Sequence, residues 1–299
     1  MVMKSKSRKK LVITRRDWDV FAAIYQAGIM AAGHILRLFF EGRGYGYVRL
    51  RMLHDAGYLG TDPYLEPVPG TRKRRKVTSF YFLRKKGIDY LSKFSKNVLR
   101  PPWKNKIHRK RFKEFYYMGE LWCRFYEQGI IKTPQSWHPS RLAKKRLGIN
   151  HFVPLHSVFY PAARSDNKCV ALYFFDEDTD NRKITMLRNA LPAVDLSGVR
   201  SHLIICETYK VMKSVLQRFT LKYPESNIRI ILHDHIDLLL EYLKNGSDIF
   251  YQELSCRLAI RGGLRRSGIF DPTPYFAIAG DGSKIYLAEL LTGKLLNLT

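Results

Sequence analysis

The chain has 299 residues, enough for about two domains, and its 45% hydrophobic and 13% aromatic residues favour folded cores over disorder. Lysine and arginine number 52 against 26 acidic residues, a net charge of +26, which predicts a polyanionic partner such as nucleic acid. The sequence has no stretch of about 18 apolar residues, no amphipathic membrane helix and no lipidation signal, so a membrane protein is not expected. The N-terminus lacks the apolar core of a signal peptide, and we expect a cytoplasmic protein.

The cysteines exclude two common kinds of small domain. None of Cys123, Cys169, Cys206 and Cys256 has a second cysteine at the spacing of a zinc or redox motif. Three of the four stand in apolar stretches, where a free cysteine behaves as a small hydrophobic residue. We therefore expect neither a disulfide scaffold nor a metal site, and a reducing compartment.

The positive charge is concentrated near the N-terminus. Residues 1–112 contain 27 Lys and Arg against 7 Asp and Glu, a net charge of +20. Residues 113–299 contain 25 against 19, a net charge of only +6. The first part of the chain should therefore attract a polyanion most strongly.

The first predicted elements are helices. Residues 1–10 are a basic arm, and Thr14 with Asp17 has the pattern of a capping box that begins a helix ended by Gly28. Apolar residues at helical spacing continue the pattern. The following elements are a helix over 31–40, a turn over 41–46 and a helix over 47–56 that Gly57 ends.

A β-hairpin follows the third helix. Residues 58–66 and 77–83 are rich in β-branched and aromatic residues and predict two strands, and the basic segment 70–76 lies between them. A helix over 84–94 closes this part. Three helices, a hairpin with a basic tip and a closing helix predict a winged helix-turn-helix domain of the α+β class over residues 11–95.

The third helix and the turn before it supply candidate DNA contacts. A helix fits the major groove of B-DNA, where arginine can bond to both acceptors of guanine. The candidates are Tyr47, Arg49 and Arg51 on the helix and Arg43 and Tyr45 in the turn. The alternative is a solvated helix face, the usual place of surface arginines.

The strongest single signal is a run of five cations, which we call the basic run: Arg72, Lys73, Arg74, Arg75 and Lys76. Adjacent like charges repel and do not stabilise a fold, but at the tip of a hairpin they can neutralise phosphates or enter a minor groove. The alternative is a solubilising loop. We favour DNA contact because a hairpin presents the run.

The remainder of the chain alternates between strands and helices. Residues 96–128 are a linker with a bridging helix over 107–128, and residues 129–299 predict an α/β domain with a partly parallel sheet. The expected strands are 151–160, 169–175, 202–206 and 228–232, the expected helices 182–190, 209–222 and 236–244, and the expected C-terminal hairpin lies near 276–288.

Residues 12–94 carry the resemblance to a family. Ile13-Thr-Arg-Arg-Asp17 opens the first helix, Val48-Arg-Leu-Arg-Met-Leu53 lies in the third, and Phe80-Tyr-Phe-Leu83 follows the basic run. In this order they resemble the bacterial replication-relaxation family, winged-helix proteins of plasmids and other mobile elements. The resemblance extends over about residues 12–240 and implies a role in replication, maintenance, transfer or transcriptional control of such an element. It also implies a restriction-endonuclease-like α/β fold in the second half.

A nuclease of the PD-(D/E)xK type needs clustered carboxylates for Mg²⁺ and a lysine. Leu155 stands where the family pattern expects the first aspartate, and no lysine stands two residues after Glu177. The site is therefore expected to be degenerate, with its acids forming a turn that caps the next helix. Catalysis by Asp176 and Asp178 with Mg²⁺ is the alternative.

The sequence thus predicts a protein without catalytic residues, cofactor or metal, bound to double-stranded DNA at the nucleoid or a plasmid. The second domain would serve self-association as a homodimer, docking of a replication or transfer protein, or DNA bending. A metal-dependent nuclease or nickase is the second hypothesis. RNA binding is weaker, because the RNP1 motif is absent and winged helices mostly bind duplexes.

Overall fold

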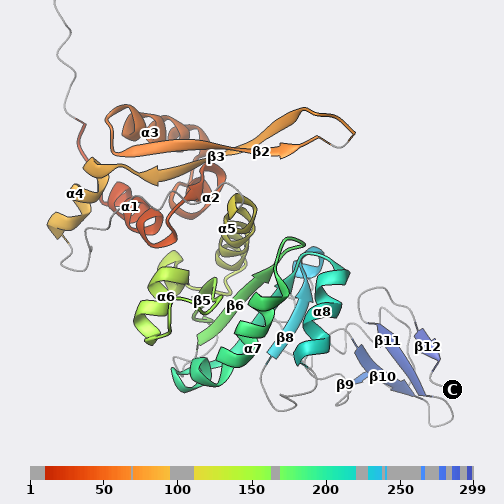
Figure 1. Cartoon of the computed structure of the whole chain (residues 1–299). Helices are drawn as coiled ribbons and strands as arrows, with labels where there is room; N and C mark the ends of the chain where they lie inside the picture. Colours follow the sequence, from red (N-terminus) through yellow and green to blue (C-terminus); the bar gives the residue numbers. More distant parts are fainter. Residues whose placement is uncertain are drawn as a thin grey trace, which may run out of the picture. The chain divides into compact units, whose positions relative to one another are not determined.

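The computed structural model of the chain divides into two compact units, Met1–Cys123 and Arg124–Thr299, which we call the first and the second unit (Figure 1). The chain has an α+β fold with an antiparallel sheet in the first unit and a mixed sheet in the second. The structure describes residues 11–68, 70–94, 111–162, 169–219, 228–237 and 240, and the strand backbone at 264–266, 276–280, 285–289 and 295–297.

The first unit combines helices with a three-stranded sheet. A two-residue strand after the first helix pairs with the second strand of a long hairpin, so the antiparallel strand order is β1-β3-β2. The elements in chain order are α1 (Arg15–Ala27), β1 (Met30–Ala31), α2 (Ala32–Phe39), α3 (Arg43–Asp55), β2 (Leu59–Pro67), β3 (Arg74–Leu83), α4 (Lys85–Phe94) and α5 (Phe112–Glu127).

The start and end of α1 are as predicted. The Thr14 hydroxyl accepts from the Asp17 amide at 3.3 Å, and the Asp17 carboxylate accepts from the Thr14 amide at 2.7 Å, which completes the capping box. Gly28 follows the helix with a φ of 90°, a conformation that favours glycine. The phase of α1 places Phe21 and Ile24 fully in the core.

A glycine sets the packing of α2 against α3. A Cβ atom on Gly46 would lie 2.2 Å from a terminal methyl group of Leu36 and 3.0 Å from the Phe40 side chain, so any other residue here would require these side chains to move. This finding corrects the predicted turn over 41–46, because α3 begins at Arg43 and the glycines lie within its first turns. Leu50 and Leu53 on the same face of α3 are fully buried, as predicted.

The base of the hairpin is fixed by aromatic packing. The ring of Phe80 on β3 lies 4.8 Å from that of Phe112, the first residue of α5, and 5.8 Å from that of Tyr64 on β2. The pairing of the strands shifts by one residue after Tyr64, which leaves Val77 as an extra residue in β3. Such a bulge bends a hairpin and redirects the side chains beyond it, here those of the tip.

The second unit contains a mixed five-stranded sheet of order β4-β5-β6-β7-β8, in which β6, β7 and β8 are parallel and β4 and β5 antiparallel. This agrees with the predicted α/β pattern, and α7 packs against α8 on one face of the sheet (Figure 1). The elements are η2 (Pro134–Ser136), β4 (Trp137–Pro139), α6 (Ser140–Leu147), β5 (Ser157–Phe159), β6 (Cys169–Phe175), α7 (Asn181–Leu196), β7 (Val199–Cys206), α8 (Tyr209–Phe219), β8 (Ile228–Leu232) and η3 (His233–His235).

The core of the second unit includes strand β6 and the aromatic side chains around β4 and β5. All seven residues of β6 are buried, as expected for a strand covered on both faces. Phe125 packs edge-on against Trp137 and Phe159, with centroid distances of 5.7 and 4.9 Å. Each such buried aromatic side chain contributes roughly 1.5–3 kcal/mol to stability through removal of apolar surface from water.

Several boundaries in the second unit differ from the prediction. The strand expected over 151–160 is reduced to β5, and α6 was not predicted. Helix α7 continues past the predicted end to Leu196, with Pro192 inside it. Most of the helix expected over 236–244 lies outside the described residues.

The strands near the C-terminus form a separate antiparallel sheet of order β12-β11-β10-β9. The predicted hairpin is confirmed, since β10 (Phe276–Gly280) pairs with β11 (Ile285–Glu289). The outer strands are β9 (Leu264–Arg266) and β12 (Leu295–Asn297). Among the described residues, none of the helices is long and apolar enough to cross a bilayer.

Candidate nucleic-acid interface

One face of α3 points to solvent. Tyr45, Tyr47 and Arg51, all predicted as contacts, are exposed, and so are Val48 and Met52. Arg43, another predicted contact, begins the helix, but its side chain lies outside the described part of the chain. The outward face of α3 is therefore formed by aromatic and apolar side chains with a single described arginine.

Arg49 does not belong to this face. The sequence analysis places it among the exposed contacts, but it is 7% exposed and binds Asp17 of α1. Its Nε donates to Asp17 Oδ1 at 2.9 Å, and its terminal nitrogen donates to the Val12 carbonyl at 2.6 Å. The expectation of exposure was wrong because Arg49 lies one turn before the buried Leu53, on the side of α3 that meets Asp17 of α1.

The Arg49–Asp17 pair is a structural tie. Burial alone raises the pKa of Asp17, but hydrogen bonds from Arg49 and from Thr14 outweigh this effect, and the pKa lies below its usual value. The same bond to Asp17 raises the pKa of Arg49. Asp17 therefore both caps α1 and fixes α3 to it, so the pair positions the outward face of α3.

Two neighbours border the outward face of α3. Tyr81 on β3 has a raised pKa, first because of its burial and then because Tyr47 and Asp55 lie near it. On another side, the Tyr45 ring lies 6.2 Å from that of Phe40, over which the Arg16 guanidinium lies at 5.4 Å. Arg16 thus places an exposed cation next to the first turns of α3.

The tip of the hairpin is a turn held by its own hydrogen bonds. The Val68 amide donates to the Lys73 carbonyl at 3.0 Å, and the Thr71 amide donates to the Val68 carbonyl at 3.1 Å. The Thr71 hydroxyl also accepts from the Lys73 amide at 3.2 Å. Gly70 has a φ of 73°, which favours glycine. The basic run is therefore presented by a hydrogen-bonded turn and not by a loose tail.

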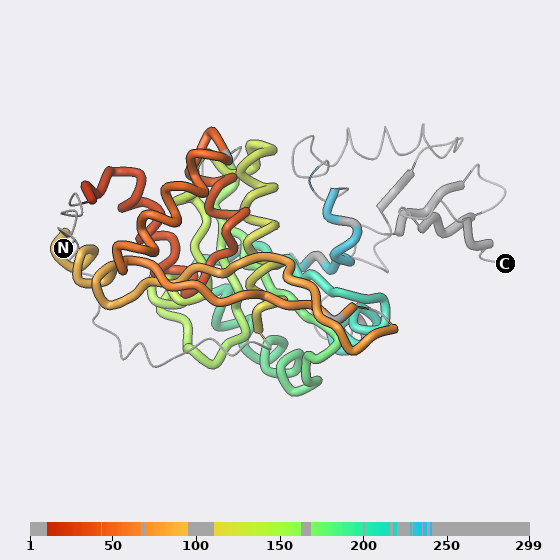
Figure 2. The backbone as a smooth tube through the Cα atoms, turned by 90° about the horizontal axis from the view of Figure 1, so that it is seen from above, coloured from red at the N-terminus to blue at the C-terminus, as the bar shows by residue number. Residues whose placement is uncertain are grey.

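All five side chains of the basic run are exposed. The run is partly in the turn and partly in β3, since the strand begins at Arg74, earlier than the sequence predicts. Arg75 lies 3.8 Å from Glu66 across the hairpin, a contact too long and too exposed to neutralise it effectively. Figures 1 and 2 show the hairpin reaching well past the helices of the first unit.

Two other cationic segments of the sequence cannot be added to this surface. The basic arm over 1–10 and the linker cations over 104–110 lie outside the described residues. Arg111 is described, and its guanidinium binds the Glu114 carboxylate, with the shorter contact at 2.7 Å. The described cations beside the outward face of α3 and at the hairpin tip are therefore Arg16, Arg51 and the basic run.

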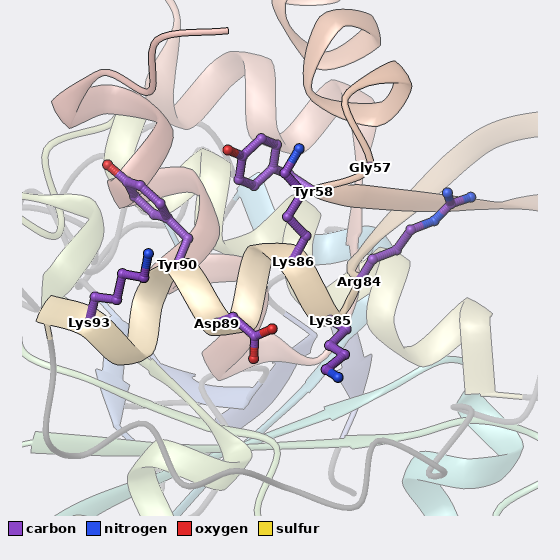
Figure 3. A pocket seen from close by; sticks show the side chains of 8 residues that line it. All are labelled: Gly57, Tyr58, Arg84, Lys85, Lys86, Asp89, Tyr90 and Lys93. Carbon is purple, nitrogen blue, oxygen red and sulfur yellow. The ribbon is translucent and has the colours of Figure 1, made fainter. Parts of the chain in front are cut away.

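An open pocket of about 610 Å³ lies on α4 (Figure 3). Lys86 Nζ donates to the Ala56 carbonyl at 2.7 Å and lies 4.4 Å from the centre of the Tyr58 ring, and Asp89 adds a carboxylate. Helix α4 lies at the end of the first unit opposite to the tip of the hairpin (Figure 1). The lining residues of the pocket are Gly57, Tyr58, Arg84, Lys85, Lys86, Asp89, Tyr90 and Lys93.

An ion cluster fixes α5 to α2 within the first unit. Arg37 donates to Glu120 at 2.6 Å, and His34, which is buried, lies 3.5 Å from the same carboxylate. Contact with His34, supported by Arg37, lowers the pKa of Glu120 to about 2 although partial burial opposes this shift. Gly119 permits the approach, since a Cβ there would lie 2.2 Å from His34 Nδ1.

Of the two acids of the nuclease alternative, Asp176 is engaged by the fold and Asp178 is exposed. Asp176 accepts from the Thr179 hydroxyl at 2.6 Å, and Asp180 is the N-cap of α7, accepting from the Arg182 amide at 2.9 Å. Glu177 and Asp178 are exposed. The predicted acidic turn before a helix is thus confirmed by the cap at Asp180.

The carboxyl ends of β6, β7 and β8 are followed by Asp176, Glu207 and His233, at the edge where open α/β sheets bind ligands. Glu207 is already engaged, because it accepts from the Glu177 amide at 3.2 Å. In the described part of the chain, no group of three or more His, Cys, Asp or Glu side chains is arranged to hold a metal ion.

One buried polar chain in the second unit has the residue types of a catalytic relay. The Tyr173 hydroxyl lies 3.1 Å from His202 Nδ1, and His202 Nε2 lies 2.6 Å from Asp195. Tyr173 and His202 are at most 1% exposed, so neither can meet a substrate. These hydrogen bonds join β6 and β7 to α7.

Sequence reasoning missed three residues of the α3 surface, namely Arg16, Val48 and Met52. The helical phase fixed by Gly46, Leu50 and their neighbours would have exposed Val48 and Met52. Arg16 could not be placed, because its position depends on contact with Phe40 across the fold.

Comparison with known proteins adds no relative: no family model, no curated protein and no solved structure matches the chain.

Proposed function

We propose that the first unit is a winged helix-turn-helix domain that binds double-stranded DNA, with α3 in the major groove and the hairpin tip on the flanking backbone or minor groove. The observation that carries this proposal is the basic run, held by a hydrogen-bonded turn at the tip of a hairpin beside an exposed helix face. An α-helix fits the major groove, and exposed cations neutralise phosphates.

The charges support a division of labour. The outward face of α3 has one described cation, Arg51, which lies 3.8 Å from Asp55, so it contributes little net charge. The cations stand at its borders, in Arg16 and the basic run. Border cations would supply affinity through phosphates, and the face of α3 would supply sequence discrimination.

The biological role follows from the resemblance of residues 12–94 to the replication-relaxation family. On that basis we place the protein in replication, transfer or transcriptional control of a bacterial mobile element. A nuclease is not proposed, because Leu155 stands where the first aspartate is expected and Asp176 is hydrogen-bonded to Thr179.

The salt dependence of binding tests this function. Fluorescence anisotropy of the full chain with a labelled duplex, from about 50 to 200 mM salt, should show an affinity loss of about 10³–10⁵ if roughly six to ten phosphates are neutralised. Removing two charges at the tip, by Arg72→Gln with Lys73→Gln, should reduce the slope of log affinity against log salt by about two.

A charge-matched control lies at the opposite end of the first unit. The double variant Lys85→Gln with Lys93→Gln also removes two exposed cations, but from the pocket on α4. Its salt slope should equal that of the wild-type chain. Equal effects of the two variants would mean that net charge and not the hairpin governs binding, and a flat salt dependence would contradict DNA binding altogether.

A further inference from the structure

The outward face of α3 carries an apolar strip in its middle. Tyr45, Val48 and Met52 follow at intervals of three and four residues, so they lie in line along the helix. They are 60%, 57% and 44% exposed, and their grouping in one line is more informative than a single exposed apolar residue. These three side chains are not among the buried residues that form the core of the first unit.

One exposed cation, Arg16, borders the strip beside Tyr45, and the charge of Arg51 on its other side is offset by Asp55. Arg16 lies over the Phe40 ring, next to Tyr45, and Arg51 pairs with Asp55 on the neighbouring line of the helix. An apolar strip bordered by positive charge is complementary to a surface that is negative at its edges and apolar within. The major groove of DNA has this character at thymine, whose 5-methyl group lies between two phosphate backbones.

We infer that the strip reads thymine methyl groups, so that the target of α3 contains T·A pairs contacted by Val48 and Met52. This inference rests on the proposed function and adds the class of base that α3 selects. Apolar side chains discriminate thymine by contact with its methyl, whereas guanine is read by arginine. Burying one methyl group favours binding by about fourfold.

Replacing thymine by deoxyuridine tests the inference, because it removes only the methyl group. The probe is the best duplex obtained when the full chain selects from a random pool of about 20 base pairs. Substituting its thymines singly by deoxyuridine should weaken binding about fourfold at one or more positions. If Val48 contacts one of these thymines, Val48→Ala should bind the thymine and the deoxyuridine duplex equally well at that position, and Met52→Ala should do the same at the thymine that Met52 contacts. The two changes, in the protein and in the DNA, then form a double-mutant cycle.

Leu196→Ala is the matched control, since Leu196 is a 90% exposed apolar residue of the second unit. It should leave every thymine-to-deoxyuridine ratio unchanged. Ratios of one at all thymines of a selected, tightly bound duplex would overturn the inference while DNA binding stands. Failure to enrich any duplex would remove the proposed function as well.

The rival occupant of the strip is a second copy of the chain. Sedimentation of the wild-type chain and of Val48→Ser with Met52→Ser, without DNA, separates the two. An unchanged oligomeric state supports base reading, because both residues are then free for DNA. Dissociation of an oligomer by the double variant would assign the strip to self-association and overturn the inference.

Discussion

The basic run at the hairpin tip and the acidic turn over 176–180 are both runs of like charge in the sequence, yet the fold treats them differently. The acidic turn is folded back on itself: Asp176 binds Thr179, and Asp180 caps α7. The basic run is held out by backbone hydrogen bonds and a threonine, and all its side chains are exposed.

From this difference we infer that a charge run is a better candidate for a binding surface when its side chains make few contacts within the fold. Asp176 and Asp180 stabilise the turn and the start of α7, whereas Arg75 of the basic run makes a long, exposed contact with Glu66 that contributes little. The same distinction separates Arg49 from Arg51, two residues apart on α3. Four predictions test this distinction between charges that serve the fold and charges that are displayed.

The largest effect is expected for Arg49. Arg49→Ala leaves the buried Asp17 carboxylate without its main partner, which should reduce the free energy of unfolding by about 3–5 kcal/mol. Arg51→Ala, at an exposed position of the same helix, should change it by no more than about 0.5 kcal/mol. Urea denaturation of both variants measures the difference, and similar losses would contradict the assignment of Arg49 to the fold.

Acidic pH should release the tie between α2 and α5. Because the pKa of Glu120 is lowered to about 2 in the folded chain, its stabilising effect is complete above its ordinary pKa of 4.5 and is lost as the pH falls from 4.5 towards 2. After allowance for partial exposure, we expect a loss of about 1–2 kcal/mol in this window.

The variant Glu120→Gln isolates this contribution. It should be less stable than the wild-type chain at pH 6, and the difference should shrink as the pH falls through the window. Asp178→Asn, at an exposed position, is the control and should retain the wild-type pH dependence of thermal unfolding. A constant gap between Glu120→Gln and wild type from pH 6 to 2 would contradict the tie.

Arg16 belongs to the displayed charges. Its removal in Arg16→Gln should weaken duplex binding about five- to tenfold at about 0.1 M salt, the loss expected for one phosphate contact, and should lower the salt slope by about one. Arg182→Gln removes an exposed arginine of the second unit and should change neither quantity. Anisotropy titrations decide, and equal curves for both variants would exclude Arg16 from the interface.

The smallest effect concerns the acidic turn. Asp180→Ala removes the cap of α7 and should cost about 0.5–1 kcal/mol of stability without changing DNA affinity. Asp178→Ala should leave stability and affinity unchanged. If the wild-type chain nicks supercoiled plasmid in Mg²⁺ and Asp178→Ala does not, these acids are catalytic. The contrast drawn between the acidic turn and the basic run would then be wrong.

The sequence predicted an element correctly where residues close together in the chain determine its structure. The capping box of Thr14 and Asp17, the strands β6 and β8 and the hairpin of β10 and β11 all occur where predicted. Each depends on neighbouring residues, either a cap, an apolar run or a pair of strand-prone segments.

Prediction failed where a distant contact decides. Gly42 and Gly46 have the sequence character of a turn, but the space beside Leu36 makes Gly46 a helix-packing residue, and this moved the start of α3. Arg49 lies one turn before the buried Leu53, and its contact with Asp17 of α1, far away in the sequence, accounts for its burial. Helix α6 was missed because Ala143 is its only residue classed as buried, so its apolar periodicity is too weak to detect.

Amide hydrogen exchange of the full chain with and without a selected duplex tests the central claim most directly. The account predicts that DNA slows exchange in peptides covering α3 and the hairpin tip, and leaves peptides covering the acidic turn unchanged. Protection confined to the second unit, with α3 and the hairpin unaffected at saturating duplex, would contradict it.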